Sequence, residues 1–347
     1  MKRIVTILFL TLFMLSVSGQ SLEETLSNLS STGASAYVAP ITGAFGSNLN
    51  SGWFNGAPPA SKLAVNVELK IVASATFFSD ENKSFSTAGT YRYTSAQVDL
   101  ILQNASTLQP GSAAYNQVKA EMMARDFAVQ FSGPTIVGSE TDFMEVKFPG
   151  EVIQGQTIGE YAVKLNGVAG FLNELSVLPQ PGVQLNLGTV YGTDVSFRYF
   201  PAIEISDLGE FSMFGFGFMH NPGVWMKNPL PLDLAFGFFY QSLEVGSIFE
   251  ASATQFGIIA SKTFGAGVSV TPYAGLTIES ANTKINYNRI FTSPAGDVSV
   301  PITFENEGDN TVGFTLGASF NLFIMKLNVD YKLASVNTAS LGISFGY

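Results

Sequence analysis

Strict alternation of apolar and polar residues is the main pattern of this chain. From position 63 to 77 every odd position is apolar, while the even positions include Asn66, Glu68, Lys70 and Ser74. A strand places successive side chains on opposite faces, so this pattern predicts one strand with an apolar face and a charged face. The alternation lasts roughly sixteen residues, whereas strands of soluble proteins usually have about five or six.

The same alternation recurs through the C-terminal half. Apolar rows of one parity occupy 183–199, 232–240, 268–278, 312–322 and 325–333, with polar residues at the intervening positions. About ten segments of roughly ten residues each, apolar outward and polar inward, are the signature of a transmembrane barrel. We therefore expect an all-β fold, a transmembrane antiparallel β-barrel of about 10 strands within a range of 8–14.

Charged residues on the inward parity are the candidates for lining the lumen and for contacting a ligand. They are Glu68, Lys70, Asp194, Arg198, Glu279, Lys326, Asp330 and Lys332. In a secreted sandwich the polar face would instead be the outer surface, and the pattern alone permits that alternative. Strand length, the N-terminal leader and the C-terminus favour the barrel.

The C-terminus has the most specific pattern. Leu341, Ile343, Phe345 and Tyr347 share one parity, small residues occupy the other, and the last residue is aromatic. This resembles the terminal β-signal of outer-membrane proteins, which the barrel-assembly machinery binds by strand augmentation. We interpret these four residues as an assembly signal and expect that machinery to be a partner during biogenesis.

The N-terminus has the three parts of a secretory signal. Lys2 and Arg3 precede an apolar run at 4–15, and small or polar residues follow, which predicts a signal peptide at 1–19. The run is shorter than the roughly 20 residues of a spanning helix. The chain has no cysteine, which excludes a lipoprotein, a disulfide framework and a thiolate metal site. We expect export to the cell outer membrane.

Residues 20–61 interrupt the pattern before the first strand. Ser21 and Glu24 form a capping box, and Leu22, Leu26 and Leu29 predict a short helix. Residues 36–59 are rich in Gly, Asn, Ser and Pro and predict a loop. Trp53 and Phe54 are its candidate anchors. Two alternatives stay open: the segment plugs the barrel, or it covers the open end from the periplasm.

A second interruption, the insertion at 79–181, divides the predicted barrel at 62–347. It contains two helical stripes and a short apolar patch at 161–165 that could add wall strands. The stripes are Val98, Ile101, Leu102 and Ala105, then Tyr115, Val118, Met122 and Arg125. Long structured insertions in barrels are often lids or plugs, but an extracellular cap without a ligand is an equal alternative.

Composition excludes several functions. With 17 basic and 27 acidic residues, the net charge of -10 disfavours nucleic acid as a partner. His220 is the one histidine, and no GxSxG motif accompanies it, so we expect no enzymatic activity. The acidic run Glu305, Glu307 and Asp309 could hold calcium, but a solvated loop is the better interpretation. We expect no cofactor and no metal.

Two stretches, 36–58 and 191–241, resemble an uncharacterised family of outer-membrane barrel proteins of Bacteroidota. The resemblance covers nearly all of the mature chain and implies the barrel fold and the outer-membrane location, with no activity to carry over. The long N-terminal segment is also similar in architecture to the outer-membrane long-chain fatty-acid transporters, whose N-terminus plugs the lumen. None of their motifs matches this sequence residue for residue.

These observations lead to two hypotheses. The first is a passive channel or transporter for small molecules, hydrophobic ligands included, that lies in outer-membrane lipid. The alternative is a structural or interaction barrel that scaffolds partners at the outer membrane. Gly215 and Gly217 face inward between phenylalanines, which leaves room in the lumen for a plug or a pore.

Overall fold

The computed structural model describes residues 22, 26, 29–173, 175–205, 209–228, 230–293 and 296–346, with only the backbone at 289–293 and 296–298. The predicted signal peptide at 1–19, the capping-box residues Ser21 and Glu24, and Tyr347 lie outside the described residues. Among the described residues, none of the helices combines the length and the apolar character that crossing a membrane would need.

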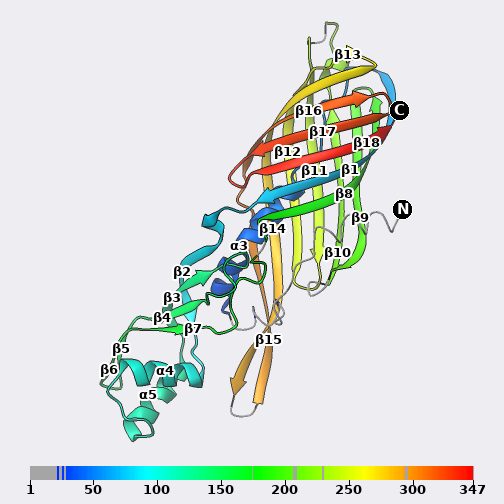
Figure 1. Ribbon diagram of the computed structural model, residues 1–347. Coiled ribbons are helices and arrows are strands. Elements are labelled where there is room, and N and C mark those ends of the chain that lie inside the picture. Colours follow the sequence, from blue (N-terminus) through cyan, green and yellow to red (C-terminus); the bar gives the residue numbers. More distant parts are fainter. Residues whose placement is uncertain are drawn as a thin grey trace.

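In the described part of the chain, ten antiparallel strands form a closed barrel, as the sequence predicts (Figure 1). Neighbours in sequence are neighbours in the wall. Strand β1 closes the barrel on β18, and β12 pairs directly with β14. The strands are β1 (Leu63–Phe77), β8 (Val177–Val190), β9 (Thr193–Ile205), β10 (Gly209–His220), β11 (Asp233–Val245), β12 (Phe249–Ser261), β14 (Val268–Ser293), β16 (Val312–Leu322), β17 (Met325–Leu333) and β18 (Thr338–Gly346).

The two faces of the wall follow the predicted alternation. On β1, Leu69 and Ile71 are exposed on the outside, whereas Glu68 and Lys70 are buried inside the barrel. The outer face is apolar over most of the wall, as a surface in contact with lipid requires. Toward the insertion, the outward parity becomes polar and includes Glu244, Glu250 and Lys284.

Several strand limits differ from the prediction. Strand β8 begins at Val177, inside the expected insertion, and β18 begins at Thr338 rather than at Leu341. The row expected at 183–199 divides between β8 and β9, and the row expected at 268–278 continues to the end of β14.

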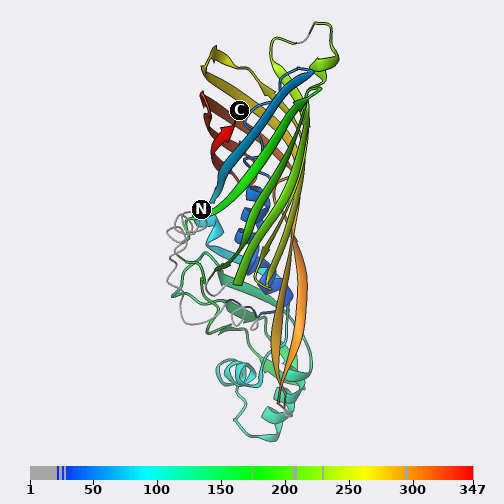
Figure 2. The same cartoon turned by 90° about the vertical axis from the view of Figure 1, so that its right-hand side faces the viewer.

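The two ends of the barrel differ in what they carry. At the end where β1 begins and β18 ends, which we call the terminal end, the connections are short except for 221–232, which contains η2 (Pro222–Trp225), and the β13 hairpin (β13, Phe264–Ala266). The opposite end, the insertion end, carries residues 78–176 and the hairpin of β14 with β15 (Gly296–Glu307), both of which project beyond the wall (Figures 1 and 2).

The insertion is a separate folded layer with its own apolar core. Strands β2 (Ser84–Tyr91), β3 (Phe127–Pro134), β4 (Glu145–Phe148) and β7 (Tyr161–Lys164) form one sheet, and β5 (Glu151–Ile153) pairs with β6 (Gln156–Ile158). The two helical stripes are α4 (Ser95–Ala105) and α5 (Ala113–Ala124), and η1 (Asp80–Asn82) precedes β2. The apolar patch at 161–165 forms β7 in this sheet and adds no strand to the barrel wall.

The loop expected at 36–59 is wrong over most of its length, because helix α3 (Ser31–Leu49) occupies it. Ser30 caps the helix by accepting a hydrogen bond from the Gly33 amide. The glycines, the serines and Pro40 predict a loop because they form isolated helices poorly. Inside the barrel, however, packing on every side outweighs this weak propensity, since most of the helix from Ile41 onward is buried.

Candidate functional site

Helix α3 and the chain that follows it fill the interior of the barrel. The helix starts among the strands of the insertion and of β15 and runs into the barrel, surrounded by the wall (Figure 2). We call residues 31–61 the plug. Its apolar side chains Tyr37, Val38, Ile41 and Leu49 are almost completely buried, so the helix is bound by the hydrophobic effect along its length.

Two glycines let the helix approach the wall and the loop between β15 and β16 closely. A methyl group on Gly46 would lie 2.8 Å from the Ala281 side chain of β14, and one on Gly43 would lie 2.6 Å from the Asp309 carboxylate. Both distances are shorter than real contacts allow. The small residues that weaken the helix in isolation are therefore the residues that let it fit in this narrow lumen.

Three cations of the barrel wall bind the last turn of α3 and the two residues that follow its C-cap, Asn50. Lys332 Nζ donates to the carbonyl oxygen of Ser47 at 3.0 Å, Arg198 Nη1 donates to that of Ser51 at 3.0 Å, and Lys70 Nζ donates to the Gly52 carbonyl at 2.9 Å. The last carbonyls of a helix lack partners within the helix and carry partial negative charge. We call Lys70, Arg198 and Lys332 the latch.

Carboxylates and amide side chains of the wall surround the latch. Glu279 pairs with Lys332 at 2.8 Å, and Asp330 accepts a hydrogen bond from the Tyr273 hydroxyl at 2.8 Å. Arg198 donates further to the Gln184 and Gln241 side chains. Glu279, Asp330 and the carbonyl oxygens of the plug together offset the positive charge of the latch.

Trp53 and Phe54 lie inside the barrel and directly follow Gly52, whose carbonyl the latch residue Lys70 binds. The Trp53 ring packs against the Arg198 guanidinium at 4.0 Å and against Phe239 at 5.2 Å. A methyl group on Gly215 would lie 2.9 Å from the Trp53 ring, so this inward glycine accommodates the tryptophan. Phe54 packs edge to face on Tyr273. The two aromatic rings thus fill the lumen where the helix ends.

The other three charged candidates lie apart from the latch, toward the terminal end. Glu68 pairs with Lys326 and accepts hydrogen bonds from Asn55 and Asn186, both at 3.0 Å. Asp194 accepts a hydrogen bond from the Thr189 hydroxyl at 2.7 Å. These groups line a polar cavity of about 320 Å³ beside plug residues 53 and 55–59. The eight candidates therefore divide into two groups. One consists of the three latch cations with Glu279 and Asp330. The other, which we call the mouth group, consists of Glu68, Lys326 and Asp194.

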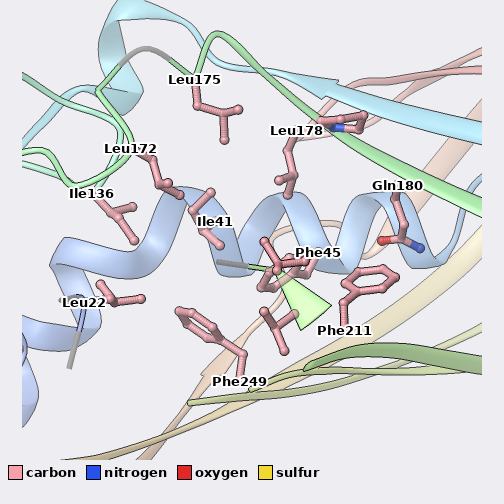
Figure 3. A pocket seen from close by; sticks show the side chains of 13 residues that line it. Leu22, Ile41, Phe45, Ile136, Leu172, Leu175, Leu178, Gln180, Phe211 and Phe249 are labelled. Atoms are coloured by element: carbon pink, nitrogen blue, oxygen red, sulfur yellow. The ribbon is translucent and has the colours of Figure 1, made fainter. Parts of the chain in front are cut away.

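A second cavity lies at the junction of the plug, the wall and the insertion (Figure 3). Its volume is about 40 Å³, and all but one of its lining residues are apolar. Ile41 and Phe45 come from α3, Phe211 and Phe249 from the wall, and Leu172 from the insertion. Residues of the plug, the wall and the insertion all line this apolar cavity.

Several residues of the site were not among the candidates. Gln184, Gln241 and Tyr273 hold the latch cations and carboxylates, yet as uncharged side chains they did not stand out among the inward polar residues. Their inward parity was the available signal. The plug groups that the latch binds are backbone carbonyls, and no side-chain pattern in a sequence can reveal those.

His220 and the acidic run occupy structural positions. The ring nitrogens of His220 lie 2.9 Å from the Thr193 hydroxyl and 3.4 Å from Trp225 Nε1, at the terminal end. Glu305 and Glu307 belong to β15, and Asn282 donates to Glu305. Within the described residues, no group of three or more His, Cys, Asp or Glu side chains is placed to hold a metal ion.

The described residues of the expected assembly signal face outward. Leu341, Ile343 and Phe345 are exposed on β18, which pairs with β17 on one side and with β1 on the other. Strand β18 therefore completes the wall. That the barrel-assembly machinery binds this strand stays a prediction.

Comparison with known proteins gives one family match. A family model described as "Family of unknown function (DUF6588)" matches residues 1–347. No curated protein matches the sequence. The resemblance to barrels of Bacteroidota and to fatty-acid transporters is not tested by these comparisons and stays a prediction.

Solved outer-membrane proteins resemble the barrel at low similarity. The N-terminal β-barrel domain of Pseudomonas aeruginosa OprF is 15% identical, with 45% of this chain and 94% of that domain covered and a TM-score of 0.21. Ail of Yersinia pestis is 12% identical, with 45% and 96% covered and a TM-score of 0.21. A loop-deletion mutant of OmpT of Vibrio cholerae is 8% identical, with 82% and 99% covered and a TM-score of 0.24. Scores this low carry no argument about function.

Proposed function

The chain belongs to the DUF6588 family of unknown function, and we propose that it is an outer-membrane barrel whose lumen is closed by its own N-terminal segment. In this proposal the plug blocks the barrel at rest, and its displacement opens a path for a small, mainly apolar molecule. The barrel is inserted by the barrel-assembly machinery, and lipid surrounds its apolar outer face.

The observation that carries the proposal is the latch. Lys70, Arg198 and Lys332 are each no more than 2% exposed, and taking such charges out of water costs several kcal/mol per ion. An apolar interior of the same volume would hold a permanent plug at lower cost. Charges that donate to backbone carbonyls of the plug are suited to a contact that can be broken and reformed.

The apolar cavity supports the choice of solute. A barrel of about ten strands is narrow, so a large hydrated solute would not pass even if the plug moved. The mainly apolar lining between α3 and the wall offers a favourable environment to an apolar molecule at the insertion end. Such a molecule could reach the cavity between the insertion and the rim of the wall.

Conductance across a planar bilayer tests the proposal. The intact protein is expected to conduct little, because the plug fills the lumen. In the latch variant, all three latch cations are replaced: Lys70→Met, Arg198→Met and Lys332→Met. This variant loses the hydrogen bonds from the wall to the plug carbonyls and is expected to have a higher conductance. Lys326→Met, which removes a cation of the mouth group, is the matched control and is expected to leave the lumen closed.

A disulfide lock separates plug movement from general loosening of the barrel. Ser47 of the plug and Thr338 of β18 have their hydroxyl oxygens 2.5 Å apart, and the chain has no native cysteine. In the latch variant, Ser47→Cys with Thr338→Cys is expected to close the barrel when oxidised and to reopen it when reduced. The proposal is contradicted if the latch variant does not conduct. It is also contradicted if the latch variant with both cysteines conducts equally in the oxidised and the reduced state.

A scaffold is the second candidate function, and the insertion favours it. The insertion has its own buried aromatic core, including Tyr93, Phe127 and Phe148, and stands beyond the wall beside the β14–β15 hairpin (Figure 1). Crosslinking on intact cells tests this alternative. Stable partners captured by the insertion, together with a latch variant that never conducts, would favour the scaffold over the gated barrel.

A further inference from the structure

One buried polar atom in the apolar cavity has no partner. Gln180 of β8 is 5% exposed, and its side-chain nitrogen donates to the Met213 sulfur at 3.3 Å. Its side-chain oxygen, Oε1, is buried without a hydrogen-bond partner among the described residues. Figure 3 shows this oxygen on the side of Phe45, toward the space between α3 and the wall. Buried acceptors without partners are rare because losing water without replacement costs free energy.

The lining defines which molecule would supply the missing donor. Gln180 is the one polar side chain among residues that are otherwise aliphatic, aromatic or proline, and none of the lining residues is charged. An ionised carboxylate or amine would lose its hydration here without gaining a counter-charge. A neutral molecule with an apolar body and one hydroxyl group would fill the apolar space and donate its proton to the free oxygen.

We propose that this cavity is a binding site for a small, uncharged apolar molecule that carries one hydrogen-bond donor, an alcohol or a phenol. The site rests on the proposed function, for which it names the class of solute. The Gln180 carbonyl oxygen selects the donor, and the surrounding phenylalanine, leucine and isoleucine side chains bind the apolar body. Charged amphiphiles such as fatty-acid anions are excluded by the uncharged lining.

The size of the cavity connects this site to the plug. The volume is about 40 Å³, whereas an apolar cavity that accommodates benzene has roughly 150 Å³. A phenol therefore enters only if lining side chains move, and Ile41 and Phe45 are the lining residues on the plug itself. Because close-packed interiors transmit such displacement, occupancy of the site pushes α3 away from the wall. Binding and opening of the lumen are coupled through these two residues.

Crystals of the purified barrel soaked with 4-bromophenol test the location of the site. The anomalous signal of bromine is expected in the cavity, among Phe45, Phe211 and Phe249. The same soak with 4-bromotoluene, which has the same shape and no donor, and with 4-bromobenzoate, which is charged, gives the matched ligand controls. A bromine peak at another place on the protein, or none with 4-bromophenol, overturns the proposal.

Calorimetric titration in detergent tests the role of Gln180. The preference for 4-bromophenol is the Kd of 4-bromotoluene divided by the Kd of 4-bromophenol. We expect this ratio to be about tenfold larger in the native protein than in Gln180→Leu, because one buried hydrogen bond has an effect of this size. Comparing this preference between variants cancels the partition of each ligand into detergent. Gln255→Leu, at another buried glutamine that does not line the cavity, is expected to keep the native preference. Equal preference in the native protein and in Gln180→Leu overturns the proposal.

The two proposals can fail separately. The conductance of the latch variants is measured without any ligand and tests only the closed lumen. If the latch variants conduct and 4-bromophenol does not bind in the cavity, the binding site is wrong and the gated barrel stands. If 4-bromophenol binds with the expected preference and no latch variant conducts, the site stands and the gated barrel is wrong.

Discussion

At the scale of single residues, cationic side chains of the wall lie next to backbone carbonyls of the plug and donate hydrogen bonds to them. Lys332 of β17 shows this most clearly, because its side chain contacts Glu279 of β14 and the Ser47 carbonyl of the plug. Removing one member of such a buried pair leaves the other charge without compensation. The contribution of each charged residue to the free energy of unfolding therefore depends on its partners. A single variant should be compared with the double variant that also neutralises the partner.

Lys332→Met is expected to lower the free energy of unfolding by about 3–5 kcal/mol, because it leaves Glu279 buried and unpaired. Urea unfolding in lipid vesicles measures this value. The double variant Lys332→Met with Glu279→Gln removes the stranded charge and is expected to recover part of the loss. If the effects of the two substitutions simply add, the pair does not act as one unit.

Gly275 of β14 provides the second prediction at this scale. A methyl group at this position would lie 2.6 Å from the ring of Phe54, so Gly275→Ala is expected to cost about 1–3 kcal/mol through overpacking. Adding Phe54→Leu makes room and should restore most of the stability. The emission wavelength of Trp53, compared in a Trp225→Phe background, reports whether the plug is seated. An unchanged spectrum and stability in Gly275→Ala would mean that Phe54 does not pack here.

At the scale of elements, position in the fold decides the structure of segments with weak propensities. Helix α3 forms inside the barrel despite three glycines and Pro40, whereas α4 and α5 have the amphipathic pattern that predicts a helix directly. The α4–α5 pair lies in the insertion, outside the wall. It is joined by Lys119, whose ammonium lies 2.6 Å from the Asp99 carboxylate.

The α4–α5 pair is expected to loosen at acidic pH. The hydrogen bond from Lys119, and then that from the Tyr115 hydroxyl, hold the pKa of Asp99 below its usual value of 3.8. A lowered carboxyl pKa gives stability that is present above about pH 4 and is lost as the pH falls through the lower folded value. Because the pair is partly exposed, we expect no more than about 1 kcal/mol.

Hydrogen exchange of residues 95–124 at pH 5 and pH 3 measures this effect. Asp99→Asn should exchange faster than the native protein at pH 5, and this difference should shrink as the pH falls through the lowered folded pKa of Asp99. Arg92→Gln, which removes another salt bridge of the insertion at Asp126, is the control. An Asp99→Asn variant that matches the native protein at pH 5 would show that the pair contributes nothing.

At the scale of the whole molecule, closure of the wall depends on the pairing of β18 with β1. These strands are paired from Glu68 with Gly346 to Thr76 with Thr338. Until β18 pairs, both strands have free edges, which lipid does not tolerate. The last strand therefore determines whether the barrel can be inserted at all.

Replacing Phe345 and Tyr347 together with serine is expected to reduce insertion into the outer membrane sharply, to a small fraction of the native level. The change removes apolar side chains from the outward parity, at the boundary of the lipid. Heat-modifiable gel mobility of membrane fractions measures the folded barrel. Ser344→Thr, on the buried inward face, keeps polarity and strand propensity and should be tolerated. Normal insertion of the double variant would contradict the assembly-signal interpretation.

The sequence by itself determined the wall of this protein. A period of two over long segments specifies strands, and the face of each residue follows from its parity, so the alternation places Glu68, Lys70, Arg198 and Lys332 on the face opposite the apolar rows. Strand length, the leader and the C-terminus then identify that face as the inside of a barrel. The presence of a strand and the direction of its side chains are local properties of the chain. That is why they can be read from residues that are near one another in sequence.

Only the tertiary structure decided what those inward residues bind. Arg198 and Lys332 lie far from Ser47 and Ser51 in sequence, and they meet at plug carbonyls only once the barrel has closed around α3. The helix itself forms because the wall buries it, not because its glycines favour a helix. The unpartnered oxygen of Gln180 likewise results from packing between three distant parts of the chain. Contacts of this kind depend on closure, which no local pattern encodes.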